Sequence, residues 1–243
     1  MQRLAREIAD VHRQRPQRRF IISHGSGSFG HVLGQRHHIR SGVNDAAGWR
    51  GFAETGYVAG QLHRLMLGAL LNAGLPVISF PPSAMFTCQD GEIIDGYFAP
   101  IRAAVAHGLI PVVFGDVAFD ETLGGTIVST EEVLAALADV FSPRHLTLAG
   151  LVDGVYDSDP LRNAVAQRLP ELRLHDLEAL GPALGDSHGV DVTGGMAAKV
   201  QAMAGLIHHH PDLQIHFLSG EIPDRLHTHL LDPERPLGTT LKR

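Results

Sequence analysis

The stretch that decides the fold is Arg19-Phe20-Ile21-Ile22-Ser23-His24-Gly25-Ser26-Gly27-Ser28-Phe29-Gly30-His31. Its first five residues predict a short buried strand, and a loop of small residues then leads into a helix. Glycines at a helix start let backbone N–H groups approach an anion, and the helix dipole favours negative charge there. An ordinary glycine-rich turn is the alternative for this segment taken alone. We interpret it as half of a strand–helix–strand unit with a phosphate-binding loop.

His31 closes this loop and favours the phosphate interpretation over the ordinary turn. An imidazole just past such a loop can donate a hydrogen bond to a phosphate oxygen, whether it is charged or neutral. A phosphate monoester is largely dianionic at neutral pH and needs no base, so phosphoryl transfer depends on positioning and charge neutralisation. We therefore expect His31 to hold an acceptor phosphate and not to act as a general base. A solvated histidine in a turn is the alternative.

A second glycine-rich helix start lies far downstream, at Asp191-Val192-Thr193-Gly194-Gly195-Met196-Ala197-Ala198-Lys199. Lys199 follows the double glycine by one helical turn, where its ammonium group can neutralise donor phosphates. Most lysines on helices are only solvated, but few lie this close to a double-glycine helix start. Two such loops in one chain predict a kinase that binds one donor and one acceptor phosphate.

Composition limits the class of protein and its partners. The chain has 243 residues, of which 44% are hydrophobic, enough for the core of one large domain or two small ones. The 26 acidic and 20 basic residues give a net charge of −6, so we expect no nucleic acid and no membrane surface as partner. Cys88 is the single cysteine, which excludes an intrachain disulfide and indicates the cytoplasm. We predict no metal site, because the run at 208–210 is typical of a solvated helix end.

Strands and helices alternate along the rest of the chain. This alternation predicts an α/β protein, a three-layer αβα sandwich around a mostly parallel central sheet. Ser129 to Glu132 match a capping box that opens a helix, and a hairpin over 84–95 turns at Gln89-Asp90-Gly91. Helical patterns cover 52–71, 99–106, part of 169–180, and 194–209, and Leu4, Ile8 and Val11 share one helical face. Strand patterns cover 76–80, 110–114, 145–149 and 214–218, with an edge strand at 238–241.

Two further segments carry possible ligand contacts. The apolar run at 110–114 ends in Gly115-Asp116, at the carboxyl edge of the predicted sheet where ligands bind in α/β proteins. A tight turn with a solvated aspartate is the alternative there. The segment Val152-Asp153-Gly154-Val155-Tyr156-Asp157-Ser158-Asp159-Pro160 combines turn residues with an aromatic ring. It predicts either a surface hairpin or a wall for a nucleotide.

Together these segments resemble the amino acid kinase superfamily and, within it, the isopentenyl phosphate kinases. The resemblance covers nearly the whole chain, in the family's order and at similar spacing. His31 is its specific part, because the Gly-Ser-Phe-Gly-His ending resembles isopentenyl phosphate and fosfomycin kinases and not glutamate or carbamate kinases. The motifs that carry it are His24-Gly-Ser-Gly-Ser-Phe-Gly-His31, Pro111-Val-Val-Phe-Gly-Asp-Val117, Val152-Asp-Gly-Val-Tyr156, and Asp191-Val-Thr-Gly-Gly-Met196 with Lys199.

The resemblance implies the amino acid kinase fold as a single domain over 1–243. Its acceptor lobe would cover about 1–142 and its nucleotide lobe about 143–243, with a boundary near Pro143. It implies ATP-dependent phosphorylation of isopentenyl phosphate to isopentenyl diphosphate in isoprenoid biosynthesis, with Mg²⁺, and we expect a homodimer. Residues 52–71 and 84–86 would line an apolar pocket for the five-carbon tail. The implied site comprises Ser26, His31 and Gly115 at the acceptor phosphate, and Gly27, Glu131, Asp153, Tyr156, Gly195 and Lys199 at ATP, with His31 and Lys199 catalytic.

The chain departs from the family pattern in two places. Family members begin with a strand carrying Lys-x-Gly-Gly-Ser, and this strand and a further lysine downstream of it do not occur here. We expect the native protein to extend upstream of Met1 with that strand, and the chain as given to be weakly active or inactive. The family's Ser-Gly-Asp pattern is here Ser129-Thr130-Glu131, whose carboxylate reaches one methylene further. Two alternatives stay open: a fosfomycin-type phosphonate kinase with a small polar pocket, and a pseudokinase or binding protein that has lost the lysines.

Overall fold

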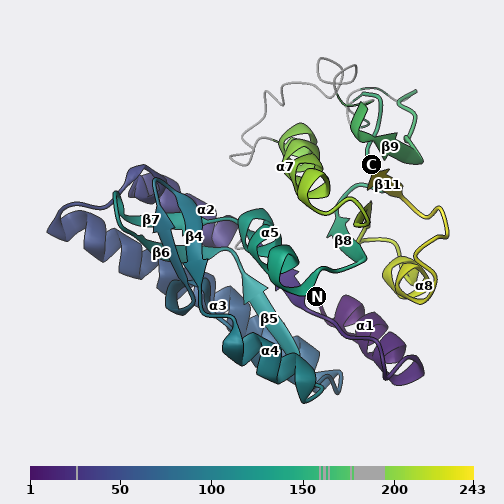
Figure 1. Ribbon diagram of the computed structural model, residues 1–243, viewed down its shortest axis with the longest axis horizontal. Helices are drawn as coiled ribbons and strands as arrows, with labels where there is room; N and C mark the ends of the chain where they lie inside the picture. The colour runs from purple at the N-terminus through teal and green to yellow at the C-terminus, as the bar shows by residue number, and fades with distance from the viewer. Residues whose placement is uncertain (26, 159, 161–162, 164, 176, 178–194) are drawn as a thin grey trace. The chain divides into compact units, whose positions relative to one another are not determined.

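The computed structural model describes all residues except 26, 159, 161–162, 164, 176 and 178–194. The chain forms two compact units, Met1–Val140 and Phe141–Arg243 (Figure 1). Both units contain strands as well as helices, so the predicted α/β class is confirmed.

The core of the first unit is a parallel sheet of three short strands. Their order is β1 (Ile22–His24), β5 (Ile110–Phe114), β2 (Val77–Ser79), and both outer strands run parallel to β5. Every residue of β5 is buried, as predicted from its continuous apolar run. Because the strands are parallel, their last residues lie towards the same edge of the sheet.

Helices α1 (Gln2–Gln14), α3 (Ala46–Asn72) and α4 (Ala99–Ala106) accompany this sheet. Ala5 and Ala9 of α1 pack against Leu70 of α3 and against the buried residues of β5. The long helix α3 begins six residues before the predicted start at 52, because the Asp45 carboxylate caps it by accepting the Gly48 N–H at 2.7 Å. The α4 bounds agree with the prediction.

A second sheet of the first unit has the order β4 (Glu92–Gly96), β3 (Phe86–Gln89), β6 (Asp116–Asp120), β7 (Gly124–Val128). The predicted hairpin is β3–β4, and its turn residues Asp90 and Gly91 adopt φ angles of 52° and 86°. The hairpin β6–β7 was not predicted, because we ended the preceding strand in a loop at Asp116. Gly115 is instead the single residue between β5 and β6, where the chain passes from one sheet into the other.

The glycine-rich loop after β1 leads into a helix, α2 (Gly27–Arg36), as expected. Two short 3₁₀ helices are η1 (Ile39–Ser41) and η2 (Pro82–Ala84). Helix α5 (Thr130–Phe141) opens with the predicted capping box. The Glu132 N–H donates to the Ser129 hydroxyl at 3.1 Å, and the Ser129 N–H donates to the Glu132 carboxylate at 2.5 Å. Arg40 pairs with the same carboxylate at 2.6 Å.

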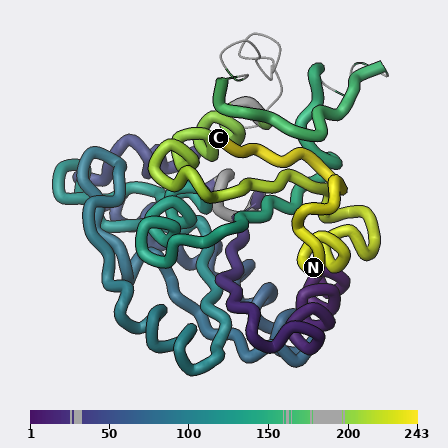
Figure 2. Tube along the Cα trace, turned by 45° about the vertical axis from the view of Figure 1, so that its right-hand side comes forward, coloured from purple at the N-terminus to yellow at the C-terminus, as the bar shows by residue number. Residues whose placement is uncertain are grey.

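The second unit contains a mixed sheet in the order β8 (His145–Gly150), β10 (Gln214–Ser219), β11 (Thr239–Lys242), β9 (Glu171–Arg173). Figure 2 shows the yellow-green trace of β10 between those of β8 and β11. The prediction of an edge strand at 238–241 was wrong in its position, because β9 pairs with the outer side of β11. Strand β9 occupies the start of the segment 169–180, and residues 174, 175 and 177 are helical, in agreement with the short helix predicted within this segment; residues 176 and 178–180 lie outside the described part.

Helices α7 (Gly195–His209) and α8 (Arg225–Leu231) complete the second unit. Val200, Met203 and Ile207 are buried along one face of α7, and the helix ends in exposed histidines, as predicted. Helix α8 was not predicted; it contacts β10 and buries Leu226. Within the residues that the structure describes, no helix is long and apolar enough to cross a membrane.

Candidate active site

One backbone oxygen joins three elements of the first unit at the edge of the parallel sheet. The carbonyl of His24, the last residue of β1, accepts the N–H of Gly115 at 3.3 Å. It also accepts the hydroxyl of Thr130, the first residue of α5, at 3.1 Å. The ends of β1 and β5 and the start of α5 therefore meet where the glycine-rich loop after β1 begins, at the sheet edge where α/β proteins bind ligands.

Glycines are needed at this junction for two different reasons. A Cβ added to Gly115 would lie 3.3 Å from the Thr130 hydroxyl oxygen and 3.4 Å from the Val128 carbonyl oxygen, closer than ordinary contact. Gly27 begins α2 with a φ of +54°, a conformation that side-chain-bearing residues rarely adopt. The backbone thus lies tightly at the end of β5, and the loop turns sharply into α2.

The remaining predicted residues of the first unit lie near this junction along the chain. His31 lies one turn into α2, and Ser26 falls outside the described residues. Glu131 lies half-buried in the first turn of α5, next to Thr130. We had noted Thr130 only as a departure from Ser-Gly-Asp, although its position directly after the capping Ser129 could have indicated a side chain facing β1 and β5.

Asp116 is buried and not a solvated turn residue, which excludes the alternative left open for it. Its side chain accepts the Ser83 hydroxyl at 2.8 Å, and the residue is 5% exposed. Burial raises the pKa of the Asp116 carboxyl, and the hydrogen bond from Ser83 opposes this increase. The second carboxylate oxygen has no hydrogen-bond partner in the described part of the chain, and it lies near Gly56 of α3.

Two histidines that we had not assigned to the site lie at the same edge of the sheet. The His24 ring stacks on Phe114, with ring centroids 5.5 Å apart, and His63 of α3 stacks on the same phenyl ring at 4.1 Å. Nε2 of His24 lies 2.9 Å from Nδ1 of His63, and Nε2 of His63 lies 2.7 Å from the hydroxyl of Ser79, the last residue of β2. Nδ1 of His24 lies 3.0 Å from the Gly25 carbonyl oxygen.

Burial keeps both rings neutral. It lowers the pKa of His24, against a smaller opposing effect of the hydrogen bond to Gly25. It also lowers the pKa of His63 to about 4, and the neighbouring His24 and Arg64 add to this decrease.

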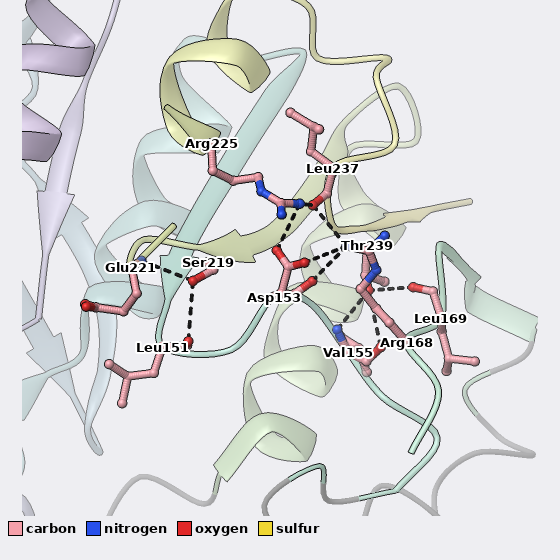
Figure 3. Close-up of polar contacts among 10 residues, drawn as sticks. All are labelled: Leu151, Asp153, Val155, Arg168, Leu169, Ser219, Glu221, Arg225, Leu237 and Thr239. Atoms are coloured by element: carbon pink, nitrogen blue, oxygen red, sulfur yellow. Dashed lines mark hydrogen bonds and ion pairs between the residues drawn. The ribbon is translucent and has the colours of Figure 1, made fainter. Parts of the chain in front are cut away.

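In the second unit, Asp153 holds the loop that follows β8. Its carboxylate pairs with Arg168 at 2.8 Å and with Arg225 at 3.2 Å, and both guanidinium groups donate to the Leu237 carbonyl (Figure 3). These ion pairs occupy the carboxylate within its own unit. The prediction that Asp153 faces ATP stays a prediction.

The residues after Asp153 are tied to β11. Gly154 has a φ of +131°, and a Cβ there would lie 2.6 Å from the hydroxyl oxygen of Thr239. The same hydroxyl accepts the Val155 N–H at 2.8 Å and donates to the Leu169 carbonyl at 2.5 Å (Figure 3). Tyr156 is half-buried and pairs with Arg168 in an antiparallel bridge. The segment therefore forms a hairpin-like excursion, one of the two structures expected for it.

Lys199 lies one turn into α7 with its side chain exposed, and Gly195 is the first residue of that helix. Residues 191–194 of the motif fall outside the described part, so the predicted donor-phosphate contact stays untested. Among the residues described, no three histidine, cysteine, aspartate or glutamate side chains gather as metal ligands.

Comparison with known proteins agrees with the resemblance drawn from the motifs. Residues 1–217 match the model of the amino acid kinase family. The chain therefore belongs to the amino acid kinase family.

Within that family, the chain is similar to isopentenyl phosphate kinases. The enzyme of Methanothermobacter thermautotrophicus is 30% identical over 96% of this chain and 87% of its own length. The Haloferax volcanii enzyme is 31% identical over 78% of this chain and 73% of its own length. A solved isopentenyl phosphate kinase structure superposes with a TM-score of 0.81 at 26% identity, covering 99% of this chain and 89% of the other.

Proposed function

We propose that this protein is a kinase that transfers the γ-phosphoryl group of ATP to isopentenyl phosphate and releases isopentenyl diphosphate and ADP. The observation that carries the proposal is the similarity to an isopentenyl phosphate kinase over 96% of this chain and 87% of that enzyme. The proposal includes Mg²⁺ with the ATP, a homodimer and a cytoplasmic location.

On the acceptor side, the phosphate contacts are assigned to Ser26, His31 and Gly115. The close approach of backbone at Gly115 and the start of α2 at Gly27 support this assignment, since helix N-termini with exposed N–H groups favour anions. An acceptor phosphate oxygen attacks the γ-phosphorus, and the bond from that phosphorus to the ADP oxygen breaks. The dianionic acceptor brings no proton that must be removed, so the protein's task is positioning and charge neutralisation.

On the nucleotide side, the assigned residues are Gly27, Glu131, Asp153, Tyr156, Gly195 and Lys199. Lys199 neutralises the donor phosphates from the start of α7, where an exposed ammonium group can reach a ligand. Asp153 acts by holding the loop after β8, because its carboxylate already pairs with two guanidinium groups. The backbone of that loop then provides the wall for the nucleotide.

The apolar tail is assigned to the face of α3 that carries Gly56 and Gly60, residues spaced by one helical turn. A Cβ on Gly56 would lie 2.9 Å from Val117, whereas a Cβ on Gly60 would meet no atom of the described residues within 4 Å. An added side chain at Gly60 would thus enter open space. Each methylene group buried there contributes about 0.8 kcal/mol to binding.

The experiment that tests the proposal uses the purified chain with ATP and Mg²⁺. ADP release is followed with isopentenyl phosphate, with fosfomycin, and without acceptor, and the product is identified by ³¹P NMR. We expect ADP release to depend on isopentenyl phosphate, with a kcat/KM at least about tenfold above that for fosfomycin. A preference for fosfomycin would establish the phosphonate kinase instead. ATP binding without turnover of either acceptor would establish a binding protein.

A further inference from the structure

His24, His63 and Ser79, which we term the histidine chain, connect the ends of two strands of the parallel sheet through α3. The order of its protons follows from the Gly25 carbonyl, which can only accept. Nδ1 of His24 therefore carries a proton and donates to that carbonyl at 3.0 Å. A neutral imidazole has one N–H, so Nε2 of His24 accepts, and its donor is Nδ1 of His63 at 2.9 Å.

The same reasoning fixes the second ring. With its proton on Nδ1, His63 accepts at Nε2 from the Ser79 hydroxyl at 2.7 Å. All three hydrogen bonds thus point in one direction, from Ser79 to Gly25, and bonds aligned in this way polarise one another. Phe114 helps to fix the orientation of both imidazole rings, because both rings stack on its phenyl ring.

We propose that the histidine chain is a positioning device that fixes the first peptide of the phosphate-binding loop and orients the loop for the acceptor phosphate. The His24 carbonyl is held by Gly115 and Thr130, and the next carbonyl along the chain, that of Gly25, is held by the histidine chain. Two successive carbonyls at the start of the loop are thereby fixed from the core. The N–H that follows the Gly25 carbonyl belongs to the same amide group, and a hydrogen bond accepted by a carbonyl strengthens its amide N–H as a donor.

None of the three residues is assigned to touch a substrate. His63 is 4% exposed, and its two ring nitrogens are occupied by His24 and Ser79. The three side chains act through the loop and are positioning residues, not catalytic ones. The kinetic part of this inference rests on the proposed function, whereas the proton order does not.

The first experiment measures the proton order in the full chain. Proteins labelled with ¹⁵N in the imidazole rings give distinct NMR signals for the Nδ1–H and Nε2–H tautomers, and His63→Phe identifies the signals of His63 and its neighbour. We expect both His24 and His63 as neutral Nδ1–H tautomers near neutral pH. An Nε2–H tautomer of either ring in the native protein would overturn the proposal, whatever substrate the enzyme uses.

The second experiment compares Ser79→Thr with Ser79→Val, two side chains of the same shape that differ in the hydroxyl group. Without the hydroxyl, Nε2 of His63 loses its donor, and the aligned hydrogen bonds that end on the Gly25 carbonyl lose their first member. We expect Ser79→Val to raise the KM for isopentenyl phosphate about three- to tenfold, the effect of one hydrogen bond, with the KM for ATP unchanged. Ser79→Thr should stay within about twofold of the native enzyme for both substrates.

A binding measurement that needs no turnover separates the two proposals. Inorganic phosphate is titrated into the native protein and both variants, and the Gly25 and Gly27 amide signals are followed by NMR. Weaker phosphate binding in Ser79→Val than in Ser79→Thr would support the histidine chain even if isopentenyl phosphate proved not to be the acceptor. Equal behaviour of the two variants in both assays would refute it.

Discussion

Each of the two units contains a cluster of histidines, and the two clusters differ in where they end. In the first unit, His24 is the last residue of β1, and His63 of α3 contacts Ser79, the last residue of β2. In the second unit, Nδ1 of His145 lies 3.2 Å from His216, whose other ring nitrogen lies 3.1 Å from the Thr240 hydroxyl. His229 of α8 packs on His216, with ring centroids 4.5 Å apart.

Each cluster contains a histidine whose pKa is lowered for the same physical reason. Burial lowers the pKa of His63 to about 4 and that of His216 to about 3, with neighbouring charged forms adding to the decrease in each case. The second cluster, however, links residues of β8, β10 and β11 within one sheet, whereas the first ends on a carbonyl of the phosphate-binding loop. Histidine chemistry alone therefore does not indicate function; the position of the cluster at a strand end does.

We expect the largest loss of activity from a substitution of Lys199, which lies in the second unit but outside its histidine cluster. Lys199→Ala should lower kcat by at least about a hundredfold, because its ammonium group is expected to stabilise charge on the transferred phosphoryl group. The dissociation constant of isopentenyl phosphate, measured calorimetrically, should hardly change. A variant within threefold of the native kcat would remove Lys199 from the mechanism and weaken the assignment of the nucleotide to this unit.

His31→Ala tests the first unit in the same way and should have a somewhat smaller effect. Loss of a hydrogen bond to a charged phosphate oxygen should lower kcat/KM for the acceptor about thirtyfold and leave ATP affinity intact. His31→Gln keeps a donor and should be less impaired. If ATP binding fell by the same factor, the two units would not divide the substrates as proposed.

Lowering the pH should reduce the free energy of unfolding through both histidine clusters, which would show that the two clusters share this physical property. The pKa values of the folded state, about 4 for His63 and about 3 for His216, lie below the ordinary value of 6.5, so the unfolded chain binds protons that the folded chain does not. Stability is therefore lost as the pH falls from about 6.5, by about 2 kcal/mol for each histidine at about pH 5.

Urea denaturation at neutral pH and at about pH 5 measures this loss of stability. His216→Phe should reduce the pH-dependent part by about 2 kcal/mol while kcat/KM at neutral pH stays near the native value. An unchanged pH dependence would mean that His216 is protonated in the folded protein. A large loss of activity at neutral pH would remove the functional contrast between the clusters.

The smallest expected effect concerns the helix that carries His63. Gly60→Leu should raise the KM for isopentenyl phosphate about tenfold by filling the space assigned to the tail, without affecting the KM for ATP. Gly68→Leu is the matched control, because Gly68 lies in the same helix and also has no described atom near an added Cβ. Equal effects at the two positions would place the tail elsewhere.

The elements that the sequence predicted well have local signals. The turn at Asp90-Gly91, the capping box at Ser129 and the apolar run of β5 each lie within a few residues, and each was found. The hairpin β6–β7 and the interior place of β11 depend on partners elsewhere in the chain. Strand β9 pairs with the outer side of β11 and is 3 residues long, too short to show a clear alternation of polar and apolar residues.

The residues of the candidate site also fall into those with a local sequence signal and those that depend on distant partners. The glycines of the loop and Gly115 follow from local spacing, and the structure joins Gly115 to the end of β1. The histidine chain could not be predicted, because His63 lies 39 positions from His24 and 16 from Ser79. Its residues meet only because the order of the sheet places β1 and β2 on either side of β5.

The first unit contains a tryptophan whose fluorescence can serve as an optical probe. Gly115 is the single residue between the end of β5 and the start of β6. In β6, the ring centroid of Phe119 lies 6.1 Å from that of Trp49. Trp49 is the single tryptophan of the chain and is 39% exposed. Its emission therefore arises from one known place, near the start of α3, where the indole ring lies against Phe119 of β6. Acceptor titrations can be read by intrinsic fluorescence without attaching a dye.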